Sequence, residues 1–104
     1  MFNLIVTSKA EEDLNQTLNY YLEILKNPNA AISLIDEIEE KFNILKYNPY
    51  ISEIENDEYL KTKSIRSVLV KNTLLFYTID EDKNEVTILR ILYARRNWID
   101  ILGK

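Results

Sequence analysis

The chain has 104 residues, 46% of them hydrophobic and 29% charged, which is typical of one ordinary globular domain. One glycine and two prolines exclude a linker-rich or disordered chain. The absence of cysteine excludes disulfides and thiol nucleophiles, and the absence of histidine removes the commonest general base and metal ligand. No apolar run approaches the ~18 residues of a membrane span and no signal peptide is recognisable, so we expect a cytoplasmic protein.

The first part of the chain predicts a strand and a helix. Residues 2–6 form a β-branched and aromatic run, which is typical of a short strand. A helix is predicted over residues 8–26, because Ser8 and Glu11 match a capping box and apolar side chains follow at helical spacing. Asp13 is one of three acids expected in the first turn, where they complement the helix dipole.

A second helix is predicted over residues 29–47, after Asn27-Pro28-Asn29, where proline cannot continue the first helix. So short a break folds the two helices into an antiparallel hairpin, and Tyr20-Tyr21 are expected to pack the helices together. The polar and acidic stretch 50–62 predicts an irregular connection or one turn of helix.

The last part of the chain predicts a three-stranded antiparallel meander. Residues 64–70 and 73–79 are joined by Lys71-Asn72, a two-residue turn in which asparagine tolerates positive φ. A third strand is predicted over 85–93 and a short terminal helix over 95–102. We therefore expect a single α+β domain over residues 1–104, with the helices on one face of the sheet. The other face would be partly open or covered by a partner.

Charge is distributed unevenly along the chain. Residues 1–60 hold four cations and twelve acids, a net charge of −8, whereas residues 61–104 hold nine cations and five acids, a net charge of +4. This asymmetry predicts a basic working face for an anionic partner, although the total of −4 argues against general nucleic-acid binding. The alternative is that the acidic residues merely solvate the helices.

Several stretches of the chain match the pattern of one known family. The most specific is an aliphatic–aromatic–tyrosine run, then an acidic turn, then Ile-Leu-Arg-Ile-Leu-x-x-Arg-Arg. On these stretches the chain resembles the RelE/ParE superfamily of bacterial toxins, the toxic components of type II toxin–antitoxin systems. The resemblance covers nearly the whole chain and rests on residues 20–22, 48–49, 65–66, 74–82 and 86–98.

The resemblance implies one of two activities. ParE-like members bind and poison DNA gyrase, whereas RelE-like members are endoribonucleases that cut mRNA on the ribosome. The ParE pattern fits better, with Tyr93 and Asn97 in place of its His and Asp. Half of the RelE set is missing, because Thr73 and Ile101 stand where that pattern has an arginine and a tyrosine. A degenerate, non-toxic relative is the third possibility.

The candidate site residues lie in the basic part of the chain. If the protein is a ribonuclease, the catalytic candidates are Tyr93, Arg95 and Arg66. A tyrosine with its ordinary pKa of about 10 needs strong help from Arg95 and Arg96 to act as a base. The candidates for contact with the target are Arg66, Arg90, Tyr93, Arg95, Arg96 and Trp98.

These residues also have purely structural interpretations. Arg66 and Arg90 would be cross-strand charges on adjacent strands, paired with Glu85 or Glu53. Trp98 would be a core or interface anchor.

The resemblance also implies partners. We expect a cognate antitoxin that wraps a helix or strand over the hairpin and sheet in a toxin–antitoxin hetero-oligomer. The target would be DNA gyrase or, in the alternative, the ribosome with its mRNA. No metal, cofactor or membrane partner is implied.

Overall fold

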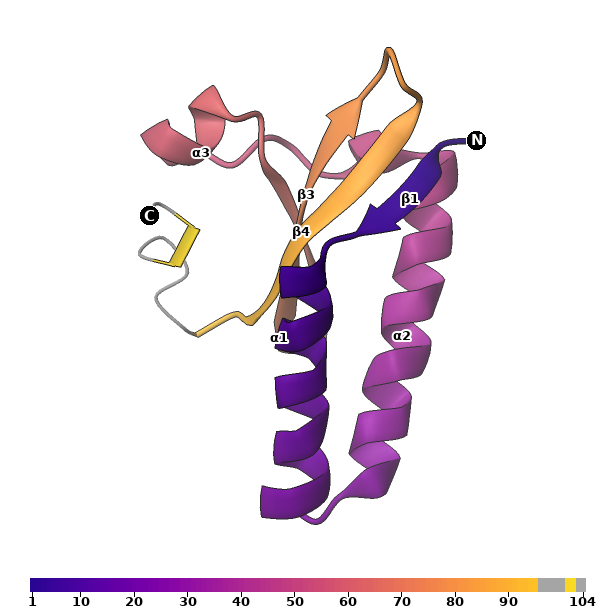
Figure 1. Cartoon of the computed structure of the whole chain (residues 1–104), viewed down its shortest axis with the longest axis vertical. Helices are drawn as coiled ribbons and strands as arrows, with labels where there is room; N and C mark the ends of the chain where they lie inside the picture. The colour runs from indigo at the N-terminus through magenta and orange to yellow at the C-terminus, as the bar shows by residue number, and fades with distance from the viewer. Residues whose placement is uncertain (96–100, 103–104) are drawn as a thin grey trace.

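The computed structural model describes residues 1–95 and 101–102 and has the α+β fold that the sequence predicts (Figure 1). The helical elements are α1 (Ser8–Asn19), the π-helix η1 (Tyr20–Ile24), α2 (Pro28–Tyr47), the 3-10 turn η2 (Pro49–Ile51) and α3 (Glu58–Thr62). The strands are β1 (Asn3–Val6), β2 (Arg66–Val70), β3 (Thr73–Asp80) and β4 (Glu85–Tyr93). They form one sheet in the order β1-β4-β3-β2, parallel between β1 and β4 and antiparallel elsewhere.

The first helix is capped by Thr7 rather than Ser8, so the predicted capping box is wrong by one residue. The Thr7 hydroxyl accepts a hydrogen bond from the N–H of Ala10 at 3.1 Å and donates one to the C=O of Leu89 at 2.9 Å. Ser8 has equal capping chemistry but no such second partner. Thr7 therefore caps the helix and ties it to β4 with one hydroxyl group.

The helix hairpin is confirmed, but its first arm changes character before the break. α1 passes into the π-helix η1, which the apolar periodicity does not predict. Asn27 then caps α2, accepting from the N–H of Ala30, and Pro28 is the first residue of α2. Tyr21 packs against the core, whereas Tyr20 is 51% exposed, so only one of the two tyrosines joins the helices to the interior.

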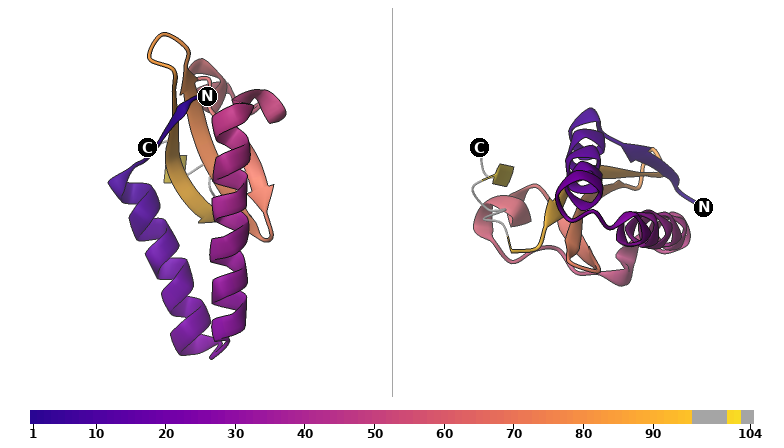
Figure 2. Two further views of the ribbon diagram at one scale, coloured as in Figure 1. Left: turned by 90° about the vertical axis from the view of Figure 1, so that its right-hand side faces the viewer. Right: turned by 90° about the horizontal axis from the view of Figure 1, so that it is seen from below.

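The two helices project past the end of the sheet at which β4 finishes (Figures 1 and 2). Four large apolar side chains near the tip of the hairpin remain 42–67% exposed: Leu22, Ile24, Leu25 and Ile32. Among the described residues, no helix is both long enough and apolar enough to cross a membrane.

The meander forms as predicted, with two local differences. In the β2–β3 turn the left-handed conformation falls on Lys71, with φ of 55°, rather than on Asn72. β4 carries one extra residue, Leu89, because Tyr77 pairs with Ile88 while Phe76 pairs with Arg90. This β-bulge bends β4 and re-aims the side chains that follow it.

The sheet has a core on each face. The larger core lies under the helices and joins α1 and α2 to β2, β3 and β4; its fully buried members include Leu34, Leu75, Tyr77 and Ile88. On the other face α3 contributes Leu60, which packs with Phe76 and Leu92, and Ile101 and Leu102 pack against the same cluster. That face was expected to be partly open, and the chain itself covers part of it.

Candidate functional site

Arg90, a predicted target-contacting residue, is partly buried, with 21% of its side chain exposed, and is bound by Asp13 of α1. Its Nε and Nη2 donate to the two carboxylate oxygens at 2.7 and 2.8 Å, and the N–H of Ile91 donates to the same carboxylate at 3.1 Å. Asp13 is only 7% exposed, and its hydrogen bonds raise the pKa of Arg90 above the ordinary value for arginine. Asp13 is therefore a buried partner of β4, not a first-turn charge that serves the helix dipole.

The expected pairing of Arg90 with Glu85 or Glu53 is thus wrong. Arg90 and Arg66 also do not lie on adjacent strands, because β3 separates β4 from β2. The residue that Arg90 needs comes from α1, 77 positions earlier in the chain.

Arg66 also has partners within the fold. Its Nη1 donates to the C=O of Ser52, and its guanidinium lies 5.2 Å from the centroid of the Tyr50 ring. The Tyr50 hydroxyl donates to Glu81, and this hydrogen bond raises the pKa of the phenol. Arg66 thereby fixes the connection between α2 and α3 against the sheet.

Tyr77 strengthens the same attachment from the core. Its hydroxyl donates to the C=O of Pro49 at 2.7 Å and shares a 2.7 Å hydrogen bond with Ser52. Burial raises the pKa of Tyr77, because the phenolate would lose its hydration.

Tyr93 and Arg95 are the predicted site residues that face solvent. Tyr93 ends β4 and is 42% exposed, and Arg95 is exposed just beyond it. The structure does not bring them to Arg66: Tyr93 lies across from Thr73, at the far end of the β2–β3 ladder. At about 3.4 Å per residue, this separation is roughly 13 Å along the sheet. Arg96, Trp98 and most of the predicted terminal helix lie outside the described residues.

A groove of about 580 Å³ adjoins Tyr93 where α1 and η1 pass the ends of β3 and β4. Its lining includes Gln16, Thr17, Tyr20, Asn72, Ile91 and Tyr93. Among the described residues that line it there is no lysine or arginine, and their one acid is Asp13, which is already paired with Arg90. Sequence reasoning missed Gln16, Thr17 and Asn72, because single uncharged polar residues on a helix or turn carry no distinctive pattern.

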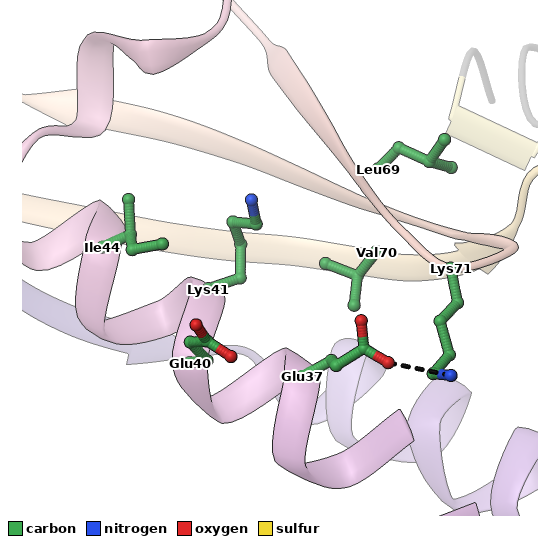
Figure 3. A pocket seen from close by; sticks show the side chains of 7 residues that line it. All are labelled: Glu37, Glu40, Lys41, Ile44, Leu69, Val70 and Lys71. Carbon is green, nitrogen blue, oxygen red and sulfur yellow. Dashed lines mark ion pairs between the residues drawn. The ribbon is translucent and has the colours of Figure 1, made fainter. Parts of the chain in front are cut away.

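A smaller cavity of about 190 Å³ lies between α2 and β2 (Figure 3). There Glu37 points toward Lys71, and the two form an ion pair of 2.8 Å. Lys41 and Glu40 also line the cavity. The acidic face of α2 is thus partly neutralised by a cation from the basic half of the chain, which reduces any division into one acidic and one basic surface.

Comparisons with known proteins agree with this fold. The family model described as "ParE toxin of type II toxin-antitoxin system, parDE" matches residues 4–98. A solved structure titled "Chromosomal ParDE TA system from P. aeruginosa" is similar with a TM-score of 0.72 and 20% identity, over 91% of this chain and 98% of that one. The toxin–antitoxin complex RelBE2 (Rv2865-2866) from Mycobacterium tuberculosis is similar with a TM-score of 0.63 and 22% identity, over 88% and 96%.

Among curated proteins, none matches the chain. The family match covers far more than half of the sequence and agrees with the order of helices and strands. The chain belongs to the ParE toxin family of type II toxin–antitoxin systems.

Proposed function

We propose that this protein arrests bacterial growth by binding and poisoning DNA gyrase, and that a cognate antitoxin neutralises it. The observation that carries the proposal is the internal use of cations: Arg90 is paired with buried Asp13, and Arg66 is bound to Ser52 and stacked on Tyr50. Among the described residues, those that line the exposed groove beside Tyr93 include no cation. With Arg66 and Arg90 engaged within the fold, this region suits a protein target better than the phosphates of an RNA strand.

Cutting a phosphodiester requires cations on the phosphorane as well as a base and an acid close together. Of the three catalytic candidates, Arg66 is engaged elsewhere and lies roughly 13 Å along the sheet from Tyr93. At the position where the RelE pattern has a further arginine, Thr73 is 2% exposed. The requirement for several cations close to the base is therefore poorly met among the described residues.

The second candidate function is ribosome-dependent cleavage of mRNA. One observation favours it: Tyr93 and Arg95 are both exposed and only two residues apart at the end of β4. A phenol beside a guanidinium is a usable base and phosphate-binding pair. In the gyrase proposal, the same two residues contact the target instead.

An antitoxin partner is supported by the exposed apolar surface of the hairpin. Leu22, Ile24, Leu25 and Ile32 are all exposed near the tip, and Leu25 also lines the groove beside Tyr93. Several large apolar side chains exposed in one region are typical of a protein-binding site. Both similar structures are toxin–antitoxin complexes by their titles, which fits a hetero-oligomer acting in the cytoplasm, where gyrase and ribosomes are found.

Induced expression in a bacterial host without antitoxin tests the proposal. We expect growth arrest with intact mRNA and a DNA-damage response. Arrest with mRNA cut at ribosomal A sites would replace the gyrase proposal by the nuclease. Unimpaired growth, with the protein present at a normal level, would contradict both activities and indicate a non-toxic relative.

A further inference from the structure

We propose that the groove beside Tyr93 binds an extended, uncharged segment of the gyrase target, which pairs with the free edge of β4. This inference rests on the proposed function and adds the place and the mode of binding. Its two supports are the unpaired position at the end of the β4 edge and the lack of unpaired charge among the described residues that line the groove.

Three different partners form hydrogen bonds with the edge of β4 that faces away from β3. β1 pairs with it from Glu85 to Ile88. Beyond β1, the Thr7 hydroxyl donates to the C=O of Leu89, and the Asp13 carboxylate accepts from the N–H of Ile91. Side chains of residues that follow β1 thus replace strand pairing at two further positions, Leu89 and Ile91.

Tyr93 is the next position on this edge. Beyond the bulge at Leu89, backbone groups alternate in direction along β4, so the N–H and C=O of Tyr93 face the same side as those of Ile91. The opposite side is already used, because the N–H of Ala94 donates to the C=O of Asn72 at 2.8 Å. Within residues 1–95 and 101–102, no group takes the place beside Tyr93 that Asp13 takes beside Ile91.

The groove opens next to this unpaired position. An exposed strand edge is a template for an added strand, and the backbone supplies the hydrogen bonds while nearby pockets accept side chains. The groove offers Tyr20, Ile91 and Tyr93 for apolar contact, and Gln16 and Asn72 as amides that can donate to and accept from a peptide backbone. An extended peptide matches both features.

The charge of the groove selects a peptide over a nucleic acid and selects an uncharged peptide over a charged one. A nucleic-acid strand needs cations for its phosphates, and within residues 1–95 and 101–102 no cation lines the groove. A charged peptide residue would have to leave water without finding an unpaired charge of opposite sign, since Asp13 is already bound to Arg90.

The test compares substitutions at two neighbouring exposed positions of α1. Gln16→Trp fills the groove, whereas Asn15→Trp adds the same side chain where it does not line the groove. Asn72→Trp narrows the groove from its opposite wall. Each purified variant is titrated against purified gyrase and against the antitoxin, and amide exchange at Tyr93 is followed with and without gyrase.

We expect Gln16→Trp and Asn72→Trp to weaken gyrase binding at least tenfold, Asn15→Trp to change it less than twofold, and the Tyr93 amide to exchange more slowly in the complex. Equal binding by Gln16→Trp and Asn15→Trp, or unchanged exchange at Tyr93, overturns the assignment of the groove while gyrase binding itself stands. Loss of antitoxin binding alone also overturns it and gives the groove to the antitoxin. If the unaltered protein binds no gyrase, the proposed function and this inference both fail.

Discussion

The two halves of β4 are stabilised in different ways. From Glu85 to Ile88 the strand lies between β1 and β3, with backbone hydrogen bonds on both sides. From Leu89 to Tyr93 only β3 remains, and the other edge depends on Thr7 and Asp13. The first half is ordinary sheet, whereas the second is held by two side chains and ends beside an open groove. Two charged residues, Asp13 and Arg90, therefore serve the fold in this second half and are not available to a partner.

Asp13→Ala is expected to have the largest effect on the stability of the second half of β4. The substitution leaves the guanidinium of Arg90 and the N–H of Ile91 without their acceptor, and breaking a buried ion pair typically costs about 3 kcal/mol or more. Chemical denaturation should show a loss of this size in the free energy of unfolding. Glu12→Ala, on the exposed face of the same helix, is the matched control and should change stability by less than about 0.5 kcal/mol. Equal effects at the two positions would contradict the role given to Asp13.

A smaller loss is expected for Thr7→Val. The variant keeps the shape of the side chain but removes both the cap of α1 and the hydrogen bond to Leu89, which together are worth about 1–2 kcal/mol. Ser8→Ala removes the hydroxyl that the capping-box pattern favours and should cost less than about 0.5 kcal/mol. Thermal unfolding of the two variants shows which residue caps α1. A larger loss of stability for Ser8→Ala than for Thr7→Val would favour Ser8 as the cap.

Tyr77→Phe should cost about 1 kcal/mol at neutral pH, because it removes hydrogen bonds to Pro49 and Ser52. The effect should depend on pH in one direction. The pKa of Tyr77 is raised in the folded protein, so its contribution to stability is complete below the unfolded value of about 10 and is lost as the pH rises toward the folded value. Urea denaturation from pH 8 to 11 should show the two proteins converging, and a gap that widens with pH would refute this sign.

The smallest effect is expected for Lys71→Ala. Its ion pair with Glu37 has a short distance of 2.8 Å, but both side chains are more than a third exposed. Exposed pairs contribute about 0.2–1 kcal/mol and are screened by salt. The loss should therefore be at most about 0.5 kcal/mol in low salt and vanish in 1 M salt. A loss that persists in high salt would indicate that Lys71 matters for the turn, where its φ is positive, rather than for the ion pair.

Local patterns predicted most of the secondary structure. The spacing of apolar residues placed both helices, Asn27-Pro28-Asn29 placed the break, and Lys71-Asn72 placed the first turn of the meander. Each of these signals acts within a few residues. The choice of Thr7 over Ser8 was missed, because the deciding partner is Leu89, 82 residues away.

The candidate site was harder to predict for the same reason. Arg66 and Arg90 were singled out as cations, but whether a cation is free depends on Ser52, Tyr50 and Asp13, which only the folded chain brings near. The parallel pairing of β1 with β4 likewise joins the two ends of the chain. Tyr93 was identified from its place in the family pattern. The groove beside it could not be predicted, because part of its lining comes from the π-helix η1.

The central claim, that the target is a protein and not RNA, is tested most directly by adding the purified protein to purified DNA gyrase and measuring supercoiling. We expect inhibition that rises with toxin concentration and is relieved by the antitoxin. Full supercoiling activity at a large molar excess of toxin, together with cleavage of mRNA by the same preparation in a translating extract, would contradict it.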